Sequence, residues 1–279
     1  TTCQFVNDEK EYIIEGEDKN YEIRKFSTFV SNMAMDIILN YVNKSIGSSQ
    51  EQKNYYDMLL INAGSMRGTM DISDIDSEFV NTTYTYLDQP PVTVKITADE
   101  YVEMLEYGLN TSIDGAFPAV AGVHFFYVRD NSNKQNKKIV TQVWKVNEKQ
   151  EPTEPIYLKC ANQEFKKGMA IDECLGTKCI LGLSDGKCVL GEITTLDLDE
   201  KKVGYKLADG EHQTSSVNRD TPYTVLIAAY ISTGGDGYPT HPAVSLESMV
   251  LSDDTKSVLM TASKDVIVKA FVSGDDATL

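Results

Sequence analysis

A glycine-rich loop that follows an apolar run carries the residues best suited to bind a ligand. The run Thr224–Tyr230 is short and continuously apolar, as expected for a strand buried on both faces. In the loop, residues 233–239, glycine fills three of four successive positions, which lets a ligand approach the main chain closely. Asp236 lies in this loop, and Tyr230 and Tyr238 flank it. An acid between aromatic residues suits a ligand with a ring and hydroxyl groups, although a tight turn with Asp as turn former explains the same pattern.

A second loop follows an apolar run in the same way. Residues 56–62 (YDMLLIN) predict a buried strand, and the small residues 63–65 come directly after it. Arg67 follows, a fixed cation whose planar fork matches phosphate oxygens. Arg24, just before the first predicted helix, adds a second cation if that helix packs nearby. Together these residues predict a nucleotide-binding loop, and the alternative for each arginine is a surface ion pair.

The sequence offers no arrangement of side chains that is typical of catalysis or of a bound metal. Hydrolysis of a phosphoester at neutral pH usually needs either water activated by metal ions or a strong nucleophile, and a two-metal site needs several converging His, Asp and Asn ligands. The three histidines, His124, His212 and His241, do not occur in such a pattern. We expect His124 to be a core or edge residue of an apolar strand. We expect His241, just past the glycine loop, to serve local hydrogen bonds, and a contact with the rim of the ligand site is the alternative. We therefore expect no catalytic residue, metal or cofactor in this chain.

Four of the five cysteines lie close together, which indicates local disulfides. Zinc is the alternative ligand for such a cluster, but the spacing lacks the paired two-residue gaps of zinc ribbons. The disulfide candidates are Cys160, Cys174, Cys179 and Cys188.

Composition limits the partners and the compartment. The chain has 279 residues, 42 acidic and 26 basic, and a formal net charge of -16, which disfavours a nucleic-acid backbone as partner. It contains no apolar run of the roughly 18 residues that a bilayer-spanning helix needs. Asn43, Asn81 and Asn110 each begin an N-glycosylation sequon. Sequons, clustered cysteines and acidity together predict a secreted or cell-surface protein.

Hydrophobic periodicity predicts alternating helices and strands, followed by a region of different character. Residues 148–220 carry the clustered cysteines, glycine turns and short apolar runs, which predicts an all-β insertion. Outside it, helices are predicted at 27–42, from Thr97 onward and at 255–268, and strands at 56–62, 92–97, 117–128, 139–146 and 224–230.

Four blocks of the sequence resemble the C-terminal domain of the 5'-nucleotidase family. The blocks occur in the order in which the family has them, and they fall within residues 20–145 and 220–272. Residues 62–67 (NAGSMR) are similar to the family's Asn-Gly-Gly-Gly-Ile-Arg motif, and residues 223–238 to its Gly-Gly-Asp-Gly segment. Residues 114–123 and the stretch from Arg24 to Asp36 are similar to two further family segments.

The resemblance implies a role for each matching residue. In that family this domain holds a base between two aromatic rings, binds ribose through an acid and helps to hold phosphate with arginines. By resemblance, the phosphate and ribose ligands are Arg24, Asn62, Gly64 and Arg67, one stacking ring is Tyr230 and the ribose-binding acid is Asp236. Leu87 stands at the position of the second ring, and the neighbouring Tyr86 can substitute for it.

We therefore predict an α/β (α+β) fold with a mixed sheet and flanking helices. Residues 20–147 and 221–279 are predicted to form the 5'-nucleotidase-like domain, after an N-terminal segment 1–20 and around the β insertion 148–220. The predicted function is extracellular binding of a nucleotide or nucleoside without catalysis. In the family, catalysis belongs to a separate metallophosphatase domain, which, like a second copy of this chain, is a predicted partner. The alternative is a structural or adhesive extracellular protein that reuses the fold with a degenerate ligand cleft.

Overall fold

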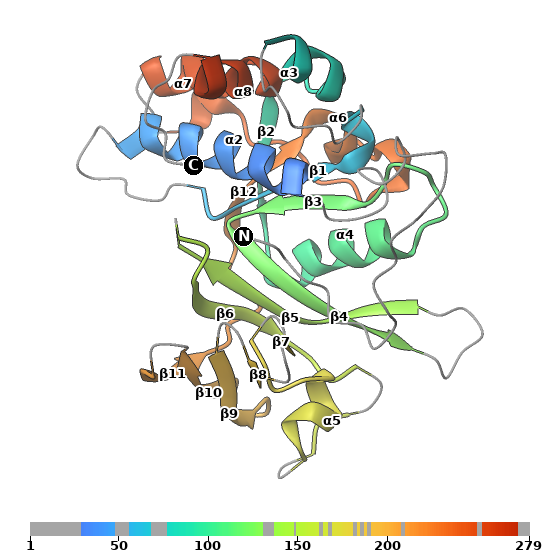
Figure 1. The fold of residues 1–279 in the computed structure, drawn as a ribbon, viewed down its shortest axis with the longest axis vertical. Coiled ribbons are helices and arrows are strands. Elements are labelled where there is room, and N and C mark those ends of the chain that lie inside the picture. Colours follow the sequence, from blue (N-terminus) through green and yellow to red (C-terminus); the bar gives the residue numbers. More distant parts are fainter. Residues whose placement is uncertain are drawn as a thin grey trace. The chain divides into compact units, whose positions relative to one another are not determined.

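The fold is mixed α/β, as predicted, and it divides into two compact units (Figure 1). We call Glu15–Ile96, Tyr107–Ala121 and Pro222–Leu279 the mixed-sheet unit, and Thr1–Ile14, Thr97–Glu106 and Gly122–Thr221 the disulfide unit. The computed structural model describes residues 29–47, 56–67, 77–130, 137–147, 149–161, 164–166, 169–180, 183–184, 187–188, 191–207, 210–249 and 253–272.

The mixed-sheet unit is built on a four-stranded sheet. The strand order is β2 (Pro91–Ile96), β12 (Tyr223–Ala228), β1 (Met58–Asn62) and β3 (Pro118–Ala121). The two central strands, β1 and β12, are parallel, and both outer strands are antiparallel to their neighbours. All five residues of β1 are buried, which explains why its sequence is a continuous apolar run.

Helices cover this sheet and extend from its strand ends. Helix α2 (Phe29–Gly47) packs against β1 and β3, and α7 (Asp253–Leu259) and α8 (Ser263–Val272) pack against α2. Figure 1 shows these three helices and α3 (Ser77–Thr83) on the same side of the strands. The short elements are the 3-10 helices η2 (Ala63–Ser65), η3 (Gly235–Gly237) and η4 (Leu246–Ser248), and the helical turn α6 (Ala229–Ser232).

The disulfide unit is made of antiparallel strands. One sheet contains β4 (Val123–Asp130), β5 (Lys137–Val146) and β6 (Pro152–Leu158), and the other contains β9 (Gly191–Asp197), β10 (Lys202–Leu207) and β11 (His212–Ser216). A two-residue hairpin, β7 (Leu183–Ser184) and β8 (Lys187–Cys188), and helix α5 (Ile171–Leu175) complete it. Trp144 and Tyr205 meet edge to face in its core, with ring centroids 5.0 Å apart.

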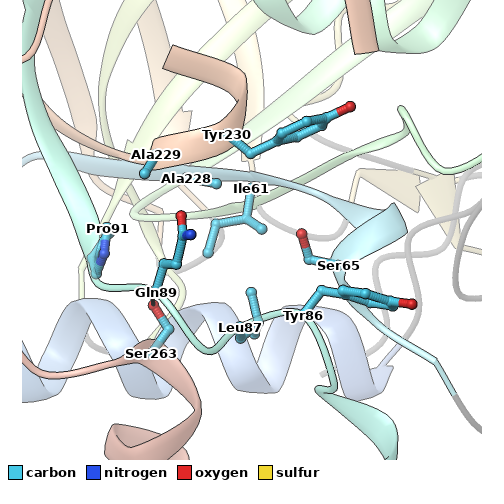
Figure 2. A pocket seen from close by; sticks show the side chains of 10 residues that line it. All are labelled: Ile61, Ser65, Tyr86, Leu87, Gln89, Pro91, Ala228, Ala229, Tyr230 and Ser263. Atoms are coloured by element: carbon cyan, nitrogen blue, oxygen red, sulfur yellow. Dashed lines mark hydrogen bonds between the residues drawn. The ribbon is translucent and has the colours of Figure 1, made fainter. Parts of the chain in front are cut away.

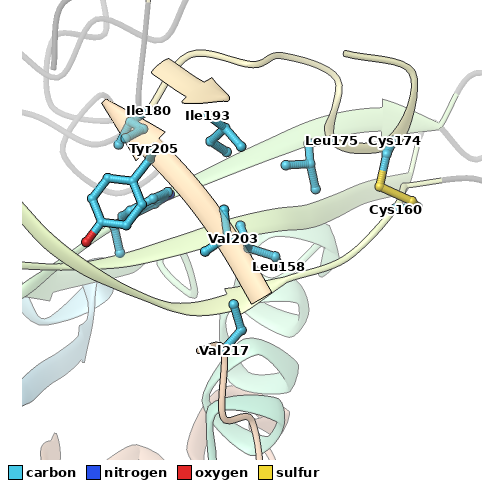
Figure 3. Packing of buried hydrophobic residues seen from close by; sticks show 10 residues of the cluster. Leu158, Cys160, Cys174, Leu175, Ile180, Ile193, Val203, Tyr205 and Val217 are labelled. Carbon is cyan, nitrogen blue, oxygen red and sulfur yellow. A yellow bond between two sulfur atoms is a disulfide. The ribbon is translucent and has the colours of Figure 1, made fainter. Parts of the chain in front are cut away.

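Two disulfides reinforce this small core. Cys160 pairs with Cys174, and Cys179 pairs with Cys188, so the four predicted cysteines are bonded to one another. Figure 3 shows the first disulfide at one end of the apolar cluster and Tyr205 at the other. The inserted domain predicted for residues 148–220 stays a prediction, since β4 and β5 also belong to this unit.

Helix α4 (Ala98–Asn110) starts at the capping box that the sequence predicts. Glu100 N donates to Thr97 Oγ1 at 3.3 Å, and Thr97 N donates to Glu100 Oε2 at 2.7 Å. These two bonds satisfy main-chain donors that the first turn of a helix leaves unpaired.

Three predicted elements are interrupted in the structure. Gly122 has a φ of +78° and divides the predicted strand 117–128 into β3 and β4. A break at residues 260–262 divides the predicted helix 255–268 into α7 and α8. The predicted strand 224–230 ends at Ala228, and Tyr230 lies in α6. This last difference matters most, because it turns Tyr230 out of the sheet, where it is exposed.

Candidate functional site

The two predicted loops meet at one edge of the mixed sheet. Because β1 and β12 are parallel, their carboxyl ends lie at the same edge, where ligands commonly bind in open α/β sheets. Asn62, the last residue of β1, donates from Nδ2 to Asp236 Oδ2 at 3.0 Å. The hydrogen bond joins residues 174 positions apart, so the loops converge as the site prediction requires.

Asp236 is the centre of a hydrogen-bonded network. Its second carboxylate oxygen, Oδ1, accepts from the Tyr230 hydroxyl at 3.0 Å, and the same hydroxyl accepts from Asp236 N at 3.2 Å. Ser65 Oγ donates to Asn62 Oδ1 at 3.0 Å, which fixes the amide so that its nitrogen faces Asp236. The Tyr107 hydroxyl donates to the main-chain oxygen of Asp236 at 2.7 Å. Asp236 is partly exposed, so this fixed carboxylate is accessible to a ligand.

The glycines around Asp236 allow this loop to exist. Asp236 itself has a φ of +53°, a left-handed conformation that Asp tolerates better than most residues. A Cβ at Gly235 would lie 2.5 Å from Tyr230 Cε1, so the ring of Tyr230 rests directly on the glycine. A Cβ at Gly237, where φ is +80°, would overlap the Tyr107 hydroxyl. The glycine pattern therefore lets two tyrosines close on the loop.

Tyr238, the other aromatic residue beside the loop, is part of its support. Its side chain is buried, and its ring packs against that of Tyr107 with centroids 5.2 Å apart. Its hydroxyl donates to Ala116 O, and burial raises its pKa far above the usual value. Of the two aromatic residues that flank Asp236, Tyr230 is thus the one that faces solvent.

A pocket opens between Tyr230 and Tyr86. Tyr230 is exposed by 52% of its surface and Tyr86 by 60%, so both rings are accessible to a ligand. Figure 2 shows the two rings on opposite sides of the pocket, with Ser65 between them. Leu87 is buried and lies on the inner wall, so Tyr86 is the ring at this place. The pocket is lined by Ile61, Ser65, Tyr86, Leu87, Gln89, Pro91, Ala228, Ala229, Tyr230 and Ser263.

Of the predicted phosphate and ribose ligands, Gly64 and Arg67 lie in the described part of the chain and Arg24 does not. Gly64 lies in the loop after β1, and a Cβ there would be 2.9 Å from Gly115 O, so the chain approaches too closely for another residue. Arg67 lies at the end of the same loop, with its guanidinium carbon 4.8 Å from the centroid of the Tyr86 ring. Arg24 lies outside the described residues, and its predicted role stays a prediction.

The three predicted glycosylation sites differ in their surroundings. Both polar atoms of the Asn43 amide are hydrogen-bonded, because Nδ2 donates to Tyr56 O and Oδ1 accepts from Tyr56 N, both at 3.1 Å. Asn81 and Asn110 are exposed, which glycosylation requires.

His241 is buried and does not line the pocket, and its Nε2 has no hydrogen-bond partner in the described part of the chain. Burial lowers the pKa of His124, as expected for a residue of a covered strand.

Among the described residues, His, Cys, Asp and Glu do not gather in any group of three that would hold a metal ion. No helix in the described ranges is long and apolar enough to cross a membrane.

The sequence alone missed several residues of the site. Tyr107 lies on α4, where helical spacing marks only the apolar residues and gives no sign that its hydroxyl reaches Asp236. Gln89, Ala229 and Ser263 line the pocket from three different segments. Ser263 N donates to Gln89 O at 3.4 Å, and only tertiary packing of this kind, which no local signal marks, brings these segments together.

Comparisons with known proteins give two similar structures. A scan against models of protein families found no match, and neither did a search of curated proteins. Among solved structures, a 5'-nucleotidase precursor from Thermus thermophilus is similar at 15% identity and a TM-score of 0.46, over 89% of this chain and 34% of that one. The NAD nucleotidase of Haemophilus influenzae is similar at 14% identity and a TM-score of 0.38, over 84% of this chain and 29% of that one. The chain thus spans about a third of the length of either structure.

Proposed function

We propose that this chain binds a nucleoside or nucleotide, with the base between the rings of Tyr86 and Tyr230. The observation that carries the proposal is the pair of exposed tyrosine rings on either side of one pocket. Ile61, Leu87 and Ala228 give the pocket an apolar wall that suits a flat aromatic base. Stacking of a base on an aromatic side chain contributes about 1–3 kcal/mol and works for any base.

Asp236 is the proposed ligand of the sugar. A carboxylate offers about four lone-pair positions, and Asn62 and Tyr230 each occupy one of them. About two positions remain, which suits two neighbouring hydroxyl groups such as those of ribose. The bond from Tyr230 to Asp236 also sets the stacking ring and the acid at a fixed distance, so one ligand can contact both.

Catalysis is assigned to another polypeptide segment. The described site contains a carboxylate, an amide and hydroxyl groups that are hydrogen-bonded to one another, and we assign these groups to binding. As part of a longer protein, the chain would bind substrate for a metal-dependent phosphohydrolase domain. Two disulfides and the exposed sequons at Asn81 and Asn110 support a secreted or cell-surface location.

Calorimetric titration with adenosine and AMP tests the proposal. Wild type should bind both, Tyr230→Ala should weaken both by about 1–3 kcal/mol, and Tyr230→Phe should lose less, since the ring remains. Met260→Ala is the matched control, because Met260 is also exposed in the mixed-sheet unit but does not line the pocket.

Two outcomes would contradict the proposal. Absence of heat with every nucleoside and nucleotide at millimolar concentration would favour the structural or adhesive alternative. Release of phosphate from AMP by this chain with Mn²⁺ or Zn²⁺ would show that the site is catalytic on its own.

A further inference from the structure

The two rings beside the pocket are held in different ways. Tyr230 rests on Gly235, and its hydroxyl is bonded to Asp236. The Tyr86 hydroxyl makes no hydrogen bond with the described part of the chain, and its ring is the more exposed of the two. A long exposed side chain rotates freely unless a contact fixes it. A stacking role for Tyr86 therefore needs a neighbour that orients its ring.

The main chain of Arg67 is fixed beside the segment that carries Tyr86. Tyr86 N donates to Ser65 O at 3.2 Å, and Arg67 N donates to Thr83 O. The two segments are thus hydrogen-bonded to each other on both sides of Met66, which is fully buried. These hydrogen bonds therefore fix the backbone of Arg67 relative to the backbone of Tyr86.

The guanidinium itself is anchored on its own loop. Nη1 of Arg67 donates to Gly64 O and, at 3.0 Å, to Met66 O. The central carbon lies 4.8 Å from the centroid of the Tyr86 ring, within the range of a cation–π interaction. A guanidinium that is bonded to two main-chain carbonyls and lies over a ring is oriented to hold that ring.

We infer that Arg67 is a positioning residue for the Tyr86 ring, and that the base-binding pair consists of two rings with separate supports. Arg67 supports Tyr86, and Asp236 supports Tyr230. The inference rests on the proposed function and adds a role for Arg67 to it, which differs from the phosphate-binding role that the resemblance implies. A positioning role affects every ligand that stacks on Tyr86, whereas a phosphate contact affects only ligands with a phosphate group.

Affinities of adenosine and AMP for Arg67→Gln separate the two roles. Loss of the cation–π contact should weaken adenosine and AMP equally, by about two- to fivefold. Lys95→Gln removes the same charge from an exposed lysine of β2 and should leave adenosine affinity unchanged. Arg67→Lys, which keeps the charge but lacks the planar fork, should also weaken adenosine. Weakening of AMP alone in both Arg67 variants would overturn the inference.

A ligand-free measurement tests the contact itself. With 3-fluorotyrosine incorporated at position 86, the fluorine resonance should move in Arg67→Gln and stay in place in Lys95→Gln. An unmoved resonance in Arg67→Gln would overturn the inference, whatever the affinities. If the wild-type chain binds neither adenosine nor AMP, the proposed function fails and the inference with it. Failure of the inference alone leaves wild-type binding of both ligands intact.

Discussion

The two units of this chain hold their side chains in place by different means. In the disulfide unit, Cys160–Cys174 and Cys179–Cys188 tie together short segments around a small apolar core. In the mixed-sheet unit, hydrogen bonds link residues that are far apart in sequence, such as Asn62 with Asp236 and Tyr238 with Ala116. The first arrangement adds stability, and the second orients partly exposed polar groups.

The candidate site lies in the mixed-sheet unit, where these hydrogen bonds hold its polar side chains. A disulfide restricts the unfolded chain and needs no exposed group to do so. A network of polar side chains compensates the free-energy cost of its desolvation only if every member has a hydrogen-bond partner. Such a network then fixes the positions of its side chains closely. Asp236 and Tyr230 are held in this way and still face solvent.

Removal of a disulfide should destabilise the disulfide unit most. The double variant Cys160→Ser, Cys174→Ser opens a loop with a sequence separation of 14, for which chain entropy predicts a loss of about 3 kcal/mol. Hydrogen exchange should rise most in residues 152–180. Unchanged exchange in that segment would show that its apolar core is sufficient without the bond.

Gly235→Ala should disturb the mixed-sheet unit at the site. The new methyl group would lie 2.5 Å from Tyr230 Cε1, and overpacking of this kind costs roughly 1–3 kcal/mol. Chemical denaturation measures the loss. In a Tyr230→Ala background the same substitution should cost much less, because the ring is gone. An equal cost in both backgrounds would mean that the glycine serves the backbone and not the ring.

Tyr107→Phe should have a smaller effect on the same network. It removes the hydroxyl that donates to Asp236 O at 2.7 Å but keeps the ring that packs on Tyr238, and should cost about 1 kcal/mol. Tyr41→Phe is a control on α2, since the Tyr41 hydroxyl has no partner in the described part of the chain. Equal stabilities of the Tyr107 and Tyr41 variants would remove Tyr107 from the network.

The smallest expected effect is a pH dependence of the disulfide unit through His124. Burial lowers its pKa from the usual 6.5, against a weaker opposing effect of a backbone hydrogen bond with Gln150. In acid the unfolded state therefore binds more protons than the folded state, so this contribution is present above pH 6.5 and is lost as the pH falls below it. His124→Gln should flatten the decline in melting temperature between about pH 7 and about pH 5. An unchanged decline would assign it to carboxylates.

Much of the fold was predictable because local patterns decide it. Continuous apolar runs mark β1 and β12, which lie at the centre of the sheet, and the capping box marks the start of α4. The departures occur where a single residue or a tertiary contact decides. Gly122 ends β3 with a positive φ, and the turn after Ala228 rotates Tyr230 outward.

The site was predictable in part for a similar reason. Asn62, Tyr230 and Asp236 lie at or just beyond the carboxyl ends of two recognisable strands, and the parallel pairing of those strands brings them together. The choice of Tyr86 over Leu87 depends on the turn after α3, which buries one side chain and exposes the other. The contribution of Tyr107 depends on the position of α4, which no pattern in the sequence encodes.

The central claim is that a base lies between Tyr86 and Tyr230, and intermolecular nuclear Overhauser effects test it most directly. With tyrosine rings labelled and assigned, the protons of bound adenosine should give contacts to both rings. Contacts to neither ring from adenosine that is shown to bind would contradict the claim.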